Sequence, residues 1–170
     1  IDKASLANAV AGQFFSLWTA AGIPGAGSAP GAAANPTSAT TGAFSFANQT
    51  APATSYLAWL AVQCSLSASN LEIHDRLAHM SGLSGTVTTS QGALSLVTNS
   101  PGAERLGAAN YSDVQWWLEI YTALGATGVN ATVAVEYNDG ATGNLAAIAL
   151  GATPRAGRLY PLISAVAGKF

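Results

Sequence analysis

Two histidines and an aspartate lie close together in the sequence and are residue types that bind metal ions. His74, Asp75 and His79 fall within the stretch HDRLAH. Their spacing differs from that of the HExxH zinc motif, and the chain has no third histidine to complete a site. On a strand, His74 and Asp75 would also point to opposite faces. We therefore expect ordinary hydrogen-bonding histidines and no metal site.

Paired carboxylates and activated nucleophiles are the other candidates for chemistry. Glu119 and Glu136 could face one another as a glycosidase acid and base do, but the alternation around them predicts a solvent-facing sheet surface. The stretch GLSG at 82–85 lacks the G-x-S-x-G spacing of a hydrolase nucleophile, and no phosphate or dinucleotide glycine motif occurs. The single cysteine, Cys64, lies in an apolar run typical of a small buried side chain. The sequence thus predicts neither an enzyme nor a bound cofactor.

Aromatic residues are the remaining side chains that could recognise a partner. In the stretch 114–122, Trp116 falls on an apolar face, whereas Trp117 and Tyr121 share the opposite face with Glu119. Exposed Trp and Tyr mark interfaces or sugar-stacking sites. We expect Trp116 in the core, and Trp117 and Tyr121 in a contact between subunits or between sheets, with carbohydrate binding as the alternative.

A second aromatic group lies near the start of the sequence. Phe14, Phe15 and Trp18 follow one another closely in a segment without charged residues. They complete the candidate interface, as anchors on a neighbouring subunit or as residues that pack onto their own domain.

The elements that must position these residues are mostly strands. Val129–Tyr137 alternates apolar and polar residues and stops at Asn138-Asp139-Gly140, a strong turn signal. We expect it to pair antiparallel with Val114–Thr122. The core of this hairpin would contain Trp116, Leu118, Ile120, Val133 and Val135.

Further strands are expected on both sides of this hairpin. The run 55–65 is almost wholly apolar, as a strand buried on both faces would be. Residues 70–76 alternate, with Leu71 and Ile73 inward, and residues 92–98, 144–150 and 158–165 are shorter candidates. Short strands separated by turn signals predict an all-β fold, an antiparallel sandwich or jelly roll.

The first third of the sequence has a different texture. Residues 5–20 fit either an amphipathic helix or a short strand around 13–19, and the pattern does not decide between them. Residues 22–42 are rich in Gly, Pro and Ala, a composition typical of an extended arm that a partner orders. We therefore divide the chain into a loop-rich N-terminal segment with this arm (1–52) and a β-domain (53–170). We expect that this domain can extend beyond the residues given.

Charge restricts the possible partners. From Ala4 to Leu71 the sequence contains no Asp, Glu, Lys or Arg, and only 8% of all residues are charged. Gly, Pro and Asn interrupt this run too often for a membrane span. A net charge of −2 provides no basic field for nucleic acid. A neutral surface of small residues is typical of one that neighbouring subunits cover.

Several stretches of the sequence resemble one known family. The runs HDRLAHMSGLSGTVTTSQ (74–91), VQWWLEIYTALGATGVNATVAVEYND (114–139), AGRLYPL (156–162) and GQFFSLWTAAGIPGAG (12–27) are similar to virion structural proteins of tailed bacteriophages. The resemblance implies a virion component, with a head decoration (cement) protein on the outer capsid surface as the leading expectation. Its partners would be the major capsid protein and copies of itself, with a homotrimer as the leading assembly. A tail or head-fibre module that binds a receptor or carbohydrate is the alternative.

Overall fold

The computed structural model describes residues 2–6, 8, 10–45, 49–54, 56, 59, 61, 63, 70–92, 101, 105–106 and 113–169. Among these residues there are short strands and irregular segments but no α-helix. The strands are β1 (Asp2–Lys3), β2 (Phe14–Phe15), β3 (Gly22–Ile23), β4 (Trp117–Glu119), β5 (Val129–Ala131), β6 (Ala134–Glu136), β7 (Thr142–Asn144), β8 (Ile148–Gly151) and β9 (Arg158–Pro161).

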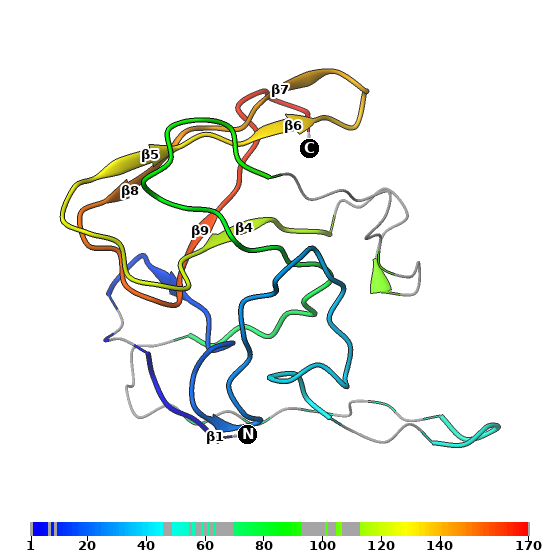
Figure 1. Ribbon diagram of the computed structural model, residues 1–170. Coiled ribbons are helices and arrows are strands. Elements are labelled where there is room, and N and C mark those ends of the chain that lie inside the picture. The colour runs from blue at the N-terminus through cyan, green and yellow to red at the C-terminus, as the bar shows by residue number, and fades with distance from the viewer. Residues whose placement is uncertain are drawn as a thin grey trace.

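All of the described strand pairs are antiparallel. A three-stranded sheet has the order β2-β9-β4, and the remaining pairs are β1–β3, β5–β8 and β6–β7. Figure 1 shows β4 beside β9, with the β5–β8 and β6–β7 pairs following one another along a second ribbon. The predicted all-β antiparallel class is confirmed, while the sandwich or jelly-roll arrangement stays a prediction.

The expected hairpin between Val114–Thr122 and Val129–Tyr137 is wrong. The first stretch contributes β4, which pairs with β9, and the second divides into β5 and β6, which pair with β8 and β7. The predicted turn causes this arrangement. Gly140 adopts a φ of 78°, and Tyr137 N–H donates to the carbonyl of Ala141 at 2.8 Å, so the chain folds directly back on itself.

The buried apolar core of the described residues is small. Ile120, Leu150 and Tyr160 form its centre, with Leu118 among the half-buried residues packed against them. The Tyr160 hydroxyl donates to the Leu150 carbonyl at 2.9 Å and links β9 to β8.

The predicted core positions are only partly correct. Ile120 is buried, and Leu118, Val133 and Val135 are half-buried. Trp116 is 38% exposed, contrary to expectation, because it precedes β4 at the end of the sheet, beyond the central cluster.

The N-terminal segment is joined to the C-terminal strands. Of the two alternatives for residues 5–20, the structure shows the short strand, because β2 pairs with β9. Residues 22–42 are irregular apart from β3, but they bond to their own chain. Ala34 exchanges backbone hydrogen bonds with His79 (3.0 and 2.9 Å), and the Asn35 amide donates to the Leu77 carbonyl. Part of this segment is therefore held by its own chain, and its ordering by a partner stays a prediction.

Two further expected strands are corrected. In the run 55–65, the described Tyr56 and Trp59 are 85% and 76% exposed, which contradicts a strand buried on both faces. Residues 70–76 form no strand, and Leu71 and Ile73 are about half exposed, because no described element covers them. The described residues between 49 and 63, drawn in cyan, extend away from the sheets (Figure 1). The prediction for 92–98, apart from Gly92, and the one for Cys64 fall outside the described residues.

Candidate functional site

A buried ion pair joins the irregular segment 70–92 to the central sheet. Nη1 of Arg76 lies 2.8 Å from Oε2 of Glu119, on β4, and only 7% of the Glu119 side chain is exposed. The expectation that Glu119 faces solvent is therefore wrong. Arg76 lies over that face of β4 and supplies the positive charge that a buried carboxylate requires.

Arg76 also organises the residues around it. Its Nη2 donates to the Ser16 hydroxyl at 3.3 Å, and its Nη1 lies 3.5 Å from the Tyr121 hydroxyl. Its guanidinium lies 4.7 Å from the centre of the Trp18 ring, a cation–π distance. We call Ser16, Trp18, Arg76, Glu119 and Tyr121 the Arg76 cluster. It connects three segments that are far apart in the sequence.

The electrostatics of the Arg76 cluster favour a neutral Tyr121 and a neutral form of the adjacent His79. Burial and the negative charge of Glu119 raise the pKa of Tyr121 to about 12. Burial and the positive charge of Arg76 lower the pKa of His79, whose ring meets Trp18 edge-on at 5.8 Å. At neutral pH Tyr121 therefore keeps its proton. A protonated phenol beside an ion pair is typical of a structural contact rather than of a nucleophile with its base.

The candidate interface residues all contact their own chain. Phe14 on β2 meets Trp117 on β4 edge-on, with 5.3 Å between the ring centres, across the intervening strand β9. Trp18 and Tyr121 belong to the Arg76 cluster, and Phe15 lines a pocket described below. Of the five, Phe14 is the one classed as exposed. A contact between subunits through these residues stays a prediction.

The residues considered for metal binding have other partners. His74 lies 3.1 Å from Glu72, and Asp75 receives two hydrogen bonds from Arg105, at 2.6 and 2.8 Å. Across the described ranges, no group of three His, Cys, Asp or Glu residues could hold a metal ion. The described part of the chain also has no helix long and apolar enough to cross a bilayer.

Exposed apolar side chains are the feature that the strand predictions missed. Tyr56, Trp59 and Ile23 are the most exposed large apolar residues described, and all three lie in the charge-free run 4–71. The continuous apolar stretch 55–65 indicated burial, but such a pattern cannot say whether the same chain or another chain buries it. The absence of charge was the signal that favoured another chain.

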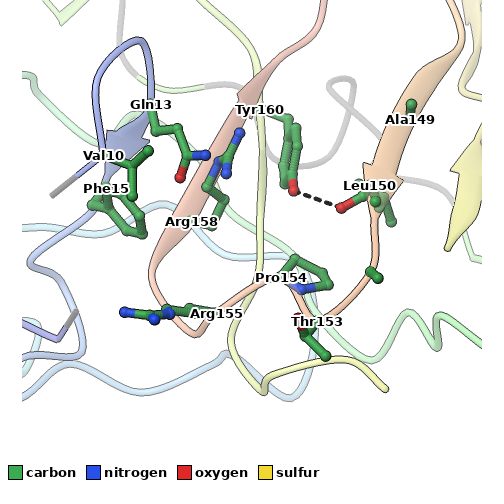
Figure 2. A pocket seen from close by; sticks show the side chains of 12 residues that line it. Val10, Gln13, Phe15, Ala149, Leu150, Thr153, Pro154, Arg155, Arg158 and Tyr160 are labelled. Carbon is green, nitrogen blue, oxygen red and sulfur yellow. Dashed lines mark hydrogen bonds between the residues drawn. The ribbon is translucent and has the colours of Figure 1, made fainter. Parts of the chain in front are cut away.

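A pocket of about 370 Å³ lies where β2, β8 and β9 meet. Phe15, Leu150 and Pro154 contribute apolar walls, and Gln13 and Arg158 project polar groups into it, as Figure 2 shows. No sequence motif pointed to this pocket, because its residues come from segments that only the fold brings together.

The chain was compared with protein-family models, with curated proteins and with solved structures, and none of them matches it.

Proposed function

We propose that this chain is a structural subunit of a bacteriophage virion, a head decoration protein that binds the outer surface of the capsid. In this role it contacts the major capsid protein and copies of itself, as a homotrimer, and carries no catalytic site. The family resemblance of the stretches 12–27, 74–91, 114–139 and 156–162 supplies the virion assignment. The structure supplies independent support for an assembly role.

The exposure of Tyr56, Trp59 and Ile23, in a run without charged residues, is the observation that carries the proposal. Covering these side chains with a neighbouring subunit removes apolar surface from water and stabilises the assembly. The exposed Tyr56 and Trp59 provide aromatic anchors of the kind that dominate interface energetics.

The physical basis of cementing is additional interface area rather than chemistry. Ala, Gly and Ser side chains lose little conformational entropy when a neighbour orders them, and they allow close backbone approach. Cyclic assembly repeats the same contacts around one axis, and a trimer fits the threefold positions of an icosahedral shell. Many copies on one shell then add their individual contributions.

The receptor-binding alternative has less support at the residues first considered for it. A stacking platform needs accessible ring faces, but Trp117 packs on Phe14, and Tyr121 lies half-buried beside Arg76. We therefore favour decoration over carbohydrate binding through these two residues.

The disruption temperature of the particle tests the proposal. Particles with the protein should withstand higher temperature and chelator concentration than particles without it, and re-adding the purified protein should restore the difference. Equal disruption temperatures for decorated and undecorated particles would show that the protein does not cement the shell. Hundreds of copies per particle are expected for decoration, whereas a few copies would favour a tail module.

A further inference from the structure

We propose that the pocket where β2, β8 and β9 meet binds a small organic carboxylate, with Arg158 as the residue that holds its charged end. This inference concerns a different part of the molecule from the exposed apolar residues. It stands or falls independently of the virion role.

The distribution of ion pairs indicates an anionic ligand. The chain has six basic residues. Arg76, Arg105 and Lys169 each pair with a carboxylate, and Lys3 donates to two backbone carbonyls. The other two, Arg155 and Arg158, have no acidic partner among the described residues.

Both of these arginines line the pocket, and no acidic residue does. Figure 2 shows Arg158 between Gln13 and Tyr160, whereas the Arg155 side chain extends away from Pro154. The pocket is therefore positively charged, with one guanidinium at its centre and a second at its edge.

Arg158 is held in a defined orientation. Its guanidinium lies 4.6 Å from the centre of the Tyr160 ring, and the Tyr160 hydroxyl is fixed by its hydrogen bond to the Leu150 carbonyl. Nε of Arg158 is buried and has no acceptor among the described residues, so a ligand in the pocket can reach only the Nη edge of the guanidinium. A carboxylate has the planar, two-oxygen geometry that fits the guanidinium fork.

The walls of the pocket indicate what the carboxylate is attached to. A volume of about 370 Å³ lies within the range of small-ligand sites. Phe15, Leu150 and Pro154 offer apolar contacts that an inorganic anion cannot use, and Gln13 adds an amide for orientation. The ligand class that uses all of these features is a carboxylate with a compact apolar body.

Calorimetric titration of the full chain with benzoate tests this assignment, with benzamide and inorganic phosphate as matched probes. We expect saturable binding of benzoate and at least about tenfold weaker binding of the other two, because each lacks either the charge or the apolar body. Arg158→Gln should weaken benzoate binding by at least about tenfold. Lys169→Gln also removes one positive charge. Because Lys169 pairs with Asp139 and does not line the pocket, this variant should leave benzoate binding unchanged.

Gln13→Glu provides a second variant in case Arg158→Gln fails to fold. This substitution places a carboxylate of the chain itself at the pocket wall. The carboxylate should form an ion pair with Arg158 and abolish benzoate binding while the protein stays folded. Absence of saturable benzoate binding to the wild type would overturn the proposal. Benzamide or phosphate binding as tight as benzoate, or unchanged affinity in Gln13→Glu, would do the same.

Discussion

At the scale of single residues, the pair of Arg76 and Glu119 is the contact on which we expect the stability of the fold to depend most. Its carboxylate is buried, and Arg76 links it to Ser16 and Trp18. Arg76→Met removes the charge but keeps an apolar side chain of similar length. We expect a loss of about 3 kcal/mol in the free energy of unfolding, since Glu119 would remain buried without its partner. Urea denaturation followed by tryptophan fluorescence measures this loss.

Two variants separate the buried charge from other effects of the substitution. Adding Glu119→Gln to Arg76→Met should recover part of the stability, because the uncompensated charge is removed. Asp75→Asn breaks the more exposed pair with Arg105 and should change stability by less than about 1 kcal/mol. Equal losses for Arg76→Met and Asp75→Asn would mean that Glu119 is not buried as described.

Sequence patterns identified some of these residues but not their partners. Trp117, Tyr121, Phe14 and Trp18 were singled out by type and spacing, and the structure places all four in ring or hydrogen-bond contacts. The burial of Glu119 could not be predicted, because alternation along one strand describes its faces and not the element that covers them. Arg76 is distant in the sequence and lies in a segment expected to be a strand.

At the scale of elements, the loop 22–42 offers a direct test of how it packs. A Cβ added at Gly27 would lie 2.3 Å from the Trp18 ring, and the Trp18 indole N–H also donates to the Ser28 carbonyl. Gly27→Ala should therefore destabilise the protein by about 1–3 kcal/mol through overpacking. Gly25→Ala, in the same loop, meets nothing within 4 Å and should be neutral or slightly stabilising.

Thermal unfolding of the two alanine variants gives the comparison. A lower melting temperature for Gly27→Ala alone would confirm that the loop is packed on Trp18. If both variants melt like the wild type, the loop does not pack on Trp18. Residues 22–42 would then be better described as the extended arm that their composition predicts.

The same contrast between local and distant interactions explains which elements could be predicted. The turn at Asn138-Asp139-Gly140 was correct, because its conformation depends on adjacent residues. The pairing of β4 with β9, through Leu118 opposite Tyr160, was missed. Pairing between strands that are distant in the sequence leaves no pattern in the sequence of either strand. A prediction from sequence therefore pairs each strand with its neighbour along the chain.

At the scale of the whole molecule, the described residues combine a small apolar core with large exposed aromatic side chains. The buried apolar residues described are Ala20, Ile120, Tyr137, Leu150 and Tyr160, while Tyr56 and Trp59 are largely exposed. A small core contributes limited hydrophobic stabilisation. The composition of the sequence indicated these exposed apolar side chains better than its periodicity did. The lack of charge over 4–71 describes the surface of that whole run, whereas periodicity describes the faces of single strands.

Self-association is the prediction that belongs to this scale. At micromolar concentration the wild-type chain should sediment as a homo-oligomer, with a trimer expected, because isolated subunits would leave Tyr56 and Trp59 in water. Replacing both with serine should shift the sedimentation coefficient toward that of the monomer. Ile163→Ser is the matched control: this side chain is 60% exposed but lies outside the charge-free run, so the oligomer should persist. A wild-type protein that remains a soluble monomer at these concentrations would contradict the assembly role, and an oligomer that survives the double substitution would place the interface elsewhere on the chain.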